Sequence, residues 1–197
     1  MVTVSTSKAY HHGDLRAALV QAGLKALEVR DIGDISLRQI AREVGVSPTA
    51  VYRHFPDKNA LLSALGQAGI EQMADWQQAA AEAATDEDAF AATGRAYVRW
   101  ALANPALFRL VFGQCSAVSD SVFGQNNAAS MLRDFAGKRA GSEAGTQRLM
   151  IQAWAIVHGL AMLMLDGQLP KDDALIDRVI DTRTLFRDQG SNSEESP

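Results

Sequence analysis

The sequence has a single cysteine, Cys115, among its 197 residues. One cysteine excludes an internal disulfide framework and a cysteine-based zinc site, and it suits a reducing compartment. Residues 1–14 also lack the apolar run of a signal peptide, so we expect a cytoplasmic protein. Hydrophobic residues make up 47% and charged residues 21%, which is the composition of an ordinary globular protein rather than a disordered or fibrous one.

An excess of positive charge is missing too, because the formal net charge is −4. Taken alone, this value argues against binding to nucleic acid. The charge is unevenly distributed, however: residues 1–60 carry eight Lys and Arg against six acidic residues, whereas the remainder carries eleven against seventeen. This asymmetry hints at a nucleic-acid contact near the N-terminal end and a different task in the rest of the chain.

No stretch alternates polar and apolar residues for long enough to predict a strand, and every strong pattern has helical periodicity. The sequence therefore predicts an all-α fold. We expect helices over residues 14–30, 37–44, 48–54, from 58 toward 84, from 88, from 105 to 112, 127–136, 149–165 and 172–187, with a bend at 137–145. The polar residues 189–197 are expected to form a disordered tail.

Residues 149–165 are apolar on all sides apart from Gln152 and His158. A membrane span is one interpretation, but the segment is short, stands alone and contains two polar residues. The simpler interpretation is a helix buried on two sides, by its own domain and by a second copy of the chain. We therefore expect a homodimer and no contact with a membrane.

Residues 36–55, SLRQIAREVGVSPTAVYRHF, predict two short helices joined by Gly45-Val46-Ser47. This arrangement is typical of a helix-turn-helix, which places its second helix in the major groove of DNA. The residues expected to face inward are Leu37, Ile40, Ala41, Val44, Val46 and Val51. The residues expected to face outward are Arg38, Arg42, Thr49, Ala50, Arg53 and His54.

The stretch from Tyr10-His11-His12-Gly13-Asp14-Leu15 to Lys58-Asn59-Ala60-Leu61-Leu62, with the helix-turn-helix inside it, resembles the DNA-binding domain of the tetracycline-repressor (TetR) family. Farther along, the Tyr97…Trp100 and Trp154…His158-Gly159 patterns resemble a C-terminal subtype named for its Trp-His-Gly signature. The resemblance implies a homodimeric, all-helical regulator. Such a regulator is usually a repressor that a small ligand releases from DNA.

The resemblance also implies roles for individual residues at the DNA. Arg38 matches a position that reaches a base edge, where an arginine fork suits guanine. Thr49, Ala50 and Arg53 match the groove-facing side of the recognition helix, and Pro48 replaces a side chain that reads bases in some relatives. Tyr52, His54 and Lys58 match positions that contact phosphate. Ser36 and Ser47 match helix caps that touch phosphate in addition.

Trp154 and His158 lie four residues apart, so they share one helix face. They either pack in a core or dimer seam, or they line an apolar pocket in which His158 is the polar group that a ligand contacts. The full set of candidate ligand residues is Tyr97, Trp100, Phe108, Phe112, Trp154, His158 and Met162. The candidate dimer-interface residues are Val157, Ile176, Val179, Ile180 and Phe186.

Other chemistry has weaker support. His11 and His12 are adjacent, without helical ligand spacing or nearby acidic partners, so we expect no metal site and no cofactor. Cys115 and His158 lack an oxyanion motif and a third catalytic group, so we expect no enzyme activity.

We thus expect a helix-turn-helix domain over residues 8–65 and a ligand-binding and dimerisation bundle over 66–188. The expected partners are operator DNA, a second copy of the chain and an unidentified small effector. Two alternatives remain: a helical ligand-binding or catalytic protein that keeps the first domain only as structure, and a DNA-binding protein that has no effector.

Overall fold

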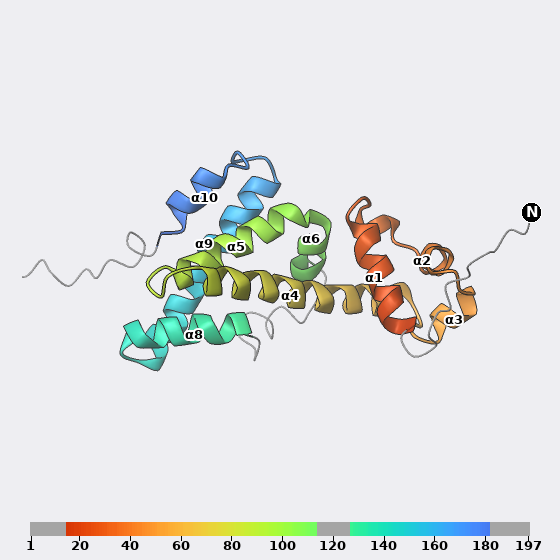
Figure 1. The fold of residues 1–197 in the computed structure, drawn as a ribbon, viewed down its shortest axis with the longest axis horizontal. Coiled ribbons are helices and arrows are strands. Elements are labelled where there is room, and N and C mark those ends of the chain that lie inside the picture. Colours follow the sequence, from red (N-terminus) through yellow and green to blue (C-terminus); the bar gives the residue numbers. More distant parts are fainter. Residues whose placement is uncertain (1–14, 114–126, 182–197) are drawn as a thin grey trace, which may run out of the picture. The chain divides into compact units, whose positions relative to one another are not determined.

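The computed structural model describes residues 15–113 and 127–181, and every regular element in these ranges is helical (Figure 1). The all-α prediction is therefore confirmed. The elements are α1 (Leu15–Leu27), the 3-10 turn η1 (Ile32–Asp34), α2 (Leu37–Val44), α3 (Pro48–Tyr52), α4 (Lys58–Ala83), α5 (Ala89–Ala103), α6 (Pro105–Gly113), α8 (Asn127–Ala140), α9 (Glu143–Leu165) and α10 (Asp173–Val179). The chain divides into two compact units, Met1–Ala68 and Gly69–Pro197.

In the first unit, α1, α2, α3 and the start of α4 surround a small apolar core. Its fully buried side chains include Leu19 of α1, Ile40 of α2, Val51 of α3 and Leu61 of α4. The crossing of α1 and α4 is close, because a Cβ on Gly23 would lie 2.7 Å from a methyl group of Leu65. This core fixes which face of α3 turns outward.

The turn between α2 and α3 depends on Gly45, whose φ of 79° lies in the left-handed region that favours glycine. The next helix is capped by Ser47, whose hydroxyl accepts a hydrogen bond from the Ala50 N–H at 3.2 Å. Asp57 caps α4 in the same way, accepting from the Ala60 N–H at 2.8 Å. These contacts confirm the helix boundaries that the sequence predicts around the motif. Ser36 occupies the position before α2, but its side chain makes no capping hydrogen bond.

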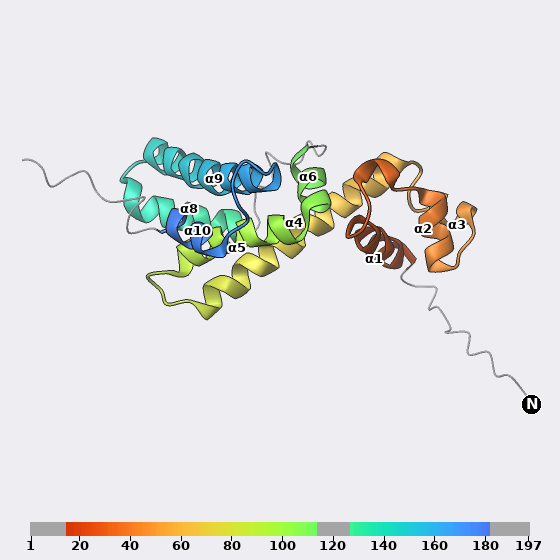
Figure 2. The ribbon, with the colours of Figure 1, turned by 90° about the horizontal axis from the view of Figure 1, so that it is seen from above.

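The second unit contains the C-terminal part of α4 and the helices from α5 to α10 (Figures 1 and 2). α5 contacts α6, α8, α9 and α10, and α8 packs along α9. The buried core includes Val98 and Trp100 of α5, Phe108 of α6 and Met164 of α9. Because α5 contacts α6, α8, α9 and α10, residues on its different sides face different parts of the bundle.

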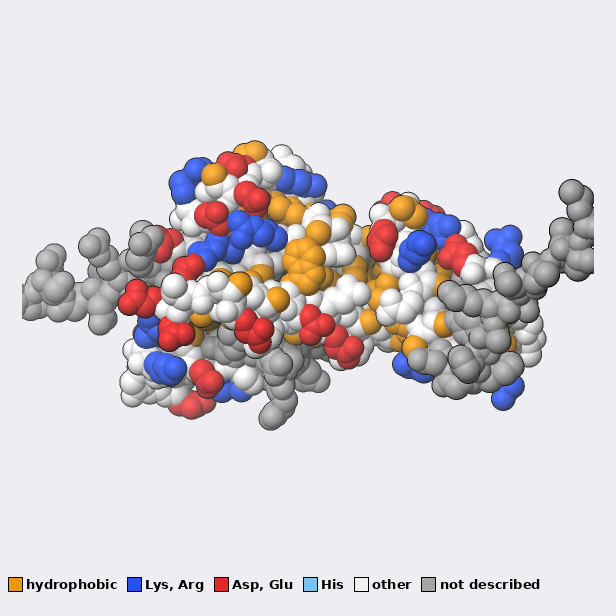
Figure 3. Space-filling view, viewed as in Figure 1, with side chains coloured by type: hydrophobic (Ala, Val, Ile, Leu, Met, Phe, Trp, Pro, Cys, Tyr) orange, Lys and Arg blue, Asp and Glu red, His pale blue; other side chains and the backbone are white. Residues whose placement is uncertain are grey.

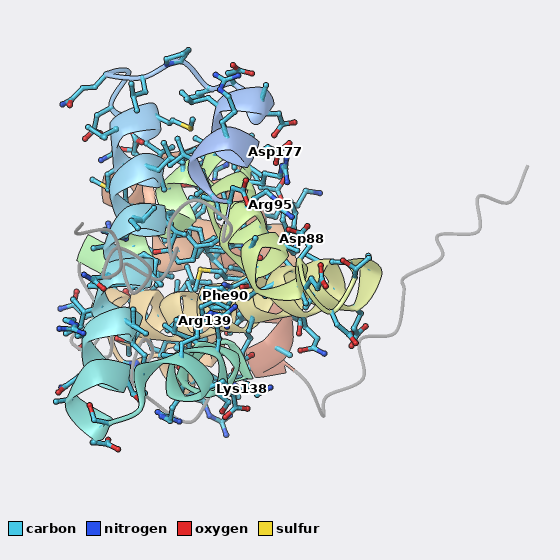
Figure 4. The ribbon with its side chains drawn as sticks, turned by 90° about the vertical axis from the view of Figure 1, so that its left-hand side faces the viewer. Asp88, Phe90, Arg95, Lys138, Arg139 and Asp177 are labelled. Atoms are coloured by element: carbon cyan, nitrogen blue, oxygen red, sulfur yellow. The ribbon has the colours of Figure 1, made fainter. Side chains whose placement is uncertain are left out.

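Ion pairs fasten α10 to α5. Arg95 pairs with Asp88 and with Asp177, and its Nη1 donates to the Ile180 carbonyl at 3.1 Å (Figure 4). Arg99 pairs with Asp173 and Asp177, both at 2.9 Å. Figure 3 shows the resulting mixture of basic and acidic side chains over α5 and α10.

Several helix boundaries differ from the prediction. α1 ends at Leu27 and α3 at Tyr52, two to three residues early, because each helix gives way to a turn. The bend predicted at 137–145 is narrower: α8 continues to Ala140, and the chain turns at Gly141, whose φ is +62°.

The helix predicted over 172–187 is shorter than expected. α10 ends at Val179, and Ile180 leaves the helical conformation with φ −102° and ψ 71°. The Ile180 carbonyl accepts the hydrogen bond from Arg95 instead of an intrahelical one. Phe186 and the predicted tail lie outside the described residues.

Candidate nucleic-acid interface and ligand site

α3 has one buried face and one exposed face. Val51 is fully buried, whereas Tyr52 is 44% exposed. Ala50 is half-buried, and the other members of the predicted DNA-facing set on and beside this helix are exposed: Ser47, Pro48, Thr49, Arg53 and His54. The helix therefore presents hydroxyl, guanidinium and imidazole groups together on its outer side.

The α2 helix adds a second set of exposed groups. Ser36 and Arg38 are exposed, and Arg38 makes no ion pair within the described part of the chain. Arg30, by contrast, is used internally, because its Nη1 donates to the Glu43 Oε1 at 2.9 Å and ties the end of α1 to α2. The Arg38 guanidinium thus remains available to an acceptor outside the protein.

Lys58 has a different environment from the one that the sequence suggests. It is half-buried, and its Nζ donates to the Gly33 carbonyl at 2.6 Å. The residue joins the start of α4 to η1 in the free protein. A contact with phosphate would have to share or replace this hydrogen bond.

Sequence reasoning gave no role to Arg16, an exposed residue in the first turn of α1. Its Cζ lies 5.3 Å from the centroid of the Phe55 ring, a cation–π contact that holds the guanidinium beside the residues that follow α3. Phe55 is itself only 1% exposed. Arg16 is therefore a further candidate phosphate contact, and no local sequence signal pointed to it, because only the packing of Phe55 brings the two residues together.

In the second unit, rings from α5, α6 and α9 form an aromatic cluster, defined as Tyr97, Trp100, Phe108, Phe112, Trp154 and His158. The His158 ring is central, with centroids 5.0 Å from Phe112, 5.1 Å from Trp154 and 5.5 Å from Phe108. Six of the seven predicted ligand residues thus lie together. Met162, the seventh, is half-buried on α9, one turn beyond His158.

The aromatic cluster has a buried side and a more open side. Trp100 and Phe108 are fully buried and Tyr97 is 4% exposed, whereas Phe112, Trp154 and His158 are half-buried. The Tyr97 hydroxyl and His158 Nδ1 are 2.9 Å apart. Burial raises the pKa of Tyr97 and lowers the pKa of His158, so both side chains are neutral near pH 7.

Two of the predicted dimer-interface residues are buried within their own protomer, and the assignment of the interface stays a prediction. Ile176 and Ile180 are 1% and 4% exposed. A Cβ on Gly94 would lie 2.9 Å from Ile180 and 3.2 Å from Val157, so both side chains press against α5. Val179 is half-buried. The side chains of Ile176 and Ile180 fill the core of their own bundle, and burial of this apolar surface holds α10 against α5, with the ion pairs of Arg95 and Arg99 beside it.

α9 is long and apolar enough to cross a membrane by length and composition alone, and 22% of its most apolar window is buried. The core helix of a soluble protein can pass the same test, so a single such helix is weak evidence for a span. Among the described residues, no group of three or more His, Cys, Asp or Glu side chains is arranged to hold a metal ion.

Comparison with known proteins gives a family match for each of the two units. Residues 16–65 match the family described as bacterial regulatory proteins, tetR family, and residues 90–183 match the tetracyclin repressor-like C-terminal domain. Neither match tests the Trp-His-Gly subtype, which stays a prediction.

Solved structures show the same fold. A protein of unknown function from Rhodococcus sp. RHA1 is 32% identical, with a TM-score of 0.69 over 88% of this chain and 93% of that one. A TetR family regulator from Marinobacter aquaeolei VT8 is 20% identical, with a TM-score of 0.59 over 84% and 91%. TetR from Acinetobacter baumannii AYE is 17% identical, with a TM-score of 0.62 over 87% and 97%. The helix-turn-helix with its exposed face, the helical second unit and the two family matches agree, and the chain belongs to the TetR family of DNA-binding transcription regulators.

Proposed function

We propose that this protein is a cytoplasmic, homodimeric repressor that binds operator DNA and leaves it when a small apolar or amphipathic ligand binds the second unit. The observation that carries the DNA-binding part is the exposed outer face of α3 together with the unpaired Arg38. A guanidinium beside small hydroxyl and methyl groups suits a mixture of base-edge and phosphate contacts.

A second copy of the chain supports recognition of two half-sites, because one recognition helix reads only a few base pairs. α9 offers a surface for that copy. Ile151 and Leu163 are 46% and 40% exposed, and the row between them carries Ala155 and Gly159. Residues four apart form one ridge on a helix, and small residues at its centre let two helices approach closely. We therefore place the dimer contact on this row, defined as the α9 ridge.

The aromatic cluster supports the effector part of the proposal. It combines apolar ring surface with a few polar atoms, which is the usual composition of a ligand site. A ligand changes DNA binding only if it favours one of two arrangements of the protein. α4 is the element that links the two units, since it begins at Lys58 in the first and ends at Ala83 in the second.

Selection of genomic fragments by the purified protein tests the DNA-binding part. We expect enrichment of a short sequence with two-fold symmetry, which the protein binds at least a hundredfold more tightly than scrambled duplex. Recovery of fragments without a common sequence would contradict operator binding. Repeating the binding measurement with cell extract that contains small molecules tests release, and unchanged affinity in every extract would favour a regulator without an effector.

Sedimentation tests the dimer. Ile151→Glu and Leu163→Glu each place a charge on the α9 ridge, so we expect monomers at micromolar concentration and loss of tight operator binding. Val29→Glu is the matched control, because Val29 is 78% exposed in the first unit and distant in sequence from α9. Wild-type protein that sediments as a monomer would contradict the proposal, as would α9-ridge variants that remain dimeric.

A further inference from the structure

Inside the aromatic cluster, the Tyr97 hydroxyl lies 2.9 Å from His158 Nδ1, within hydrogen-bond distance. The Trp154 indole N–H is buried and has no hydrogen-bond partner among the described residues. His158 Nδ1 is thus the one acceptor that the described part of the chain offers to the Tyr97 O–H.

This hydrogen bond has a direction. The buried Tyr97 hydroxyl has one proton to donate, and His158 Nδ1 is its one acceptor among the described residues, so Tyr97 donates and Nδ1 accepts. A neutral imidazole that accepts at Nδ1 carries its proton at Nε2. His158 Nε2 is therefore an N–H donor, and it has no hydrogen-bond partner within residues 15–113 and 127–181.

Within the described residues, no ion pair or hydrogen bond joins a charged side chain to His158. Burial is the cause of the lowered pKa of His158, and no charged neighbour contributes to the shift. The arginines next in sequence to Phe108 and Trp100 of the cluster are already paired: Arg109 of α6 with Asp166 at 2.6 Å, and Arg99 of α5 with Asp173 and Asp177. A charged ligand would lose its hydration here and gain no counter-charge.

The rings on the open side of the aromatic cluster form the surface on which a ligand bound to His158 would lie. The half-buried rings of Phe112 and Trp154 are those whose centroids lie 5.0 and 5.1 Å from His158. Flat apolar groups pack well against such rings, by stacking or edge-to-face contact.

We infer that the effector is an uncharged molecule with a flat apolar body and one hydrogen-bond acceptor, such as an aryl ketone or ester, whose oxygen accepts from His158 Nε2 while its body lies against Phe112 and Trp154. This inference rests on the proposed effector function and specifies the ligand class of the same site. Tyr97 acts by fixing the tautomer of His158.

Four probes of similar size test the ligand class by calorimetric titration of the full chain: acetophenone, ethylbenzene, benzoate and phenyltrimethylammonium. We expect acetophenone to bind about 2- to 13-fold more tightly than ethylbenzene, the ratio that corresponds to one hydrogen bond. Both ions should bind more weakly than ethylbenzene. Equal affinity for acetophenone and ethylbenzene, tightest binding of either ion, or no binding of any probe would overturn the inference.

His158→Phe keeps a ring and removes the donor. This variant should bind acetophenone no more tightly than ethylbenzene, and its affinity for ethylbenzene should be nearly that of the wild-type protein. Tyr97→Phe tests the positioning role of Tyr97, because it keeps His158 but removes the hydroxyl that orients it. The ratio of the affinities for acetophenone and ethylbenzene should therefore fall only in part. Nitrogen-15 spectra of wild-type protein should show His158 protonated at Nε2, a readout that does not depend on the folding of either variant. Protonation at Nδ1 would contradict the assigned direction.

Operator binding in the presence of each probe separates this inference from the proposed function. If benzoate or the cation binds and releases DNA, the effector function stands and the ligand class is wrong. If acetophenone binds through His158 but operator affinity is unchanged, the ligand class stands and release by ligand is wrong. Release by acetophenone that His158→Phe prevents would support both.

Discussion

Lys58 and Gly33 are joined by a hydrogen bond of 2.6 Å, from the side-chain ammonium at the start of α4 to a backbone carbonyl in η1. The contact fastens the segment before α2 to the helix that leads into the second unit. A residue whose position matches a phosphate contact thus also has a structural role in the free protein. Removing it should change both stability and DNA binding.

For Lys58→Ala we expect the free energy of unfolding to fall by about 0.5–1.5 kcal/mol, the typical net value of one hydrogen bond. If Lys58 also contacts phosphate, the slope of log K against log salt should become shallower by roughly one on any DNA sequence. Lys25→Ala, which changes an exposed lysine at the end of α1, is the control for charge alone. Reduced stability with an unchanged salt slope would leave Lys58 only its structural role.

Arg38→Ala should weaken binding to the operator by about 1–3 kcal/mol per half-site and relax the preference for one base pair, because a bidentate arginine discriminates by that amount. Arg42→Ala changes an exposed arginine on the same helix and should affect operator and scrambled duplex alike. Binding isotherms on both duplexes distinguish the two variants. Equal losses on both duplexes for Arg38→Ala would show that Arg38 supplies only positive charge.

Arg95→Met should loosen α10. The Arg95 side chain is 16% exposed and has three partners, whereas Asp88 and Asp177 are about half exposed, so solvent screens the ion pairs. We expect a loss of about 1–2 kcal/mol in urea unfolding and faster hydrogen exchange in residues 173–180. Arg109→Met removes one ion pair between exposed partners and should cost less than about 1 kcal/mol. Equal losses of stability in Arg95→Met and Arg109→Met would contradict a special role of Arg95 in holding α10.

Burial of His158 predicts a stability change with pH. Because its pKa in the folded protein lies below the ordinary value of 6.5, the unfolded chain binds more protons as the pH falls through 6.5. The contribution of neutral His158 is present above pH 6.5 and is lost as the pH falls from there to the folded pKa. Urea unfolding should show a shallower decrease in this window for His158→Phe than for wild-type protein. Parallel plots of stability against pH for wild-type protein and His158→Phe would contradict a lowered pKa of His158.

The sequence predicted most of the first unit because its signals are local. Gly45 has the left-handed backbone expected of a helix stop, and Ser47 and Asp57 accept the capping hydrogen bonds that their positions indicate. Each of these features depends on residues three or four positions apart. The exposed set on α3 followed from the same periodicity, since Val51 had to face the core.

Local patterns did not show which neighbour covers an apolar face. The stripe on α10 predicted an interface, but Ile176 and Ile180 fill the core of their own protomer beside Gly94. The packing of these side chains against Gly94 of α5 decides this, and it joins positions far apart in the chain. The same holds for the early end of α10, where the Ile180 carbonyl accepts from Arg95.

The sequence alone thus determined the helical fold, the helix-turn-helix and, except for the half-buried Ala50, the exposure of the residues predicted to face outward, because helix periodicity and caps act within one or two turns. Only the tertiary structure decided that Lys58 is bound to Gly33, that Arg16 lies over Phe55 and that Tyr97 meets His158. Each of these pairs joins different helices or the turns beside them. Their distance depends on how the helices pack, a property that no periodicity within one helix contains.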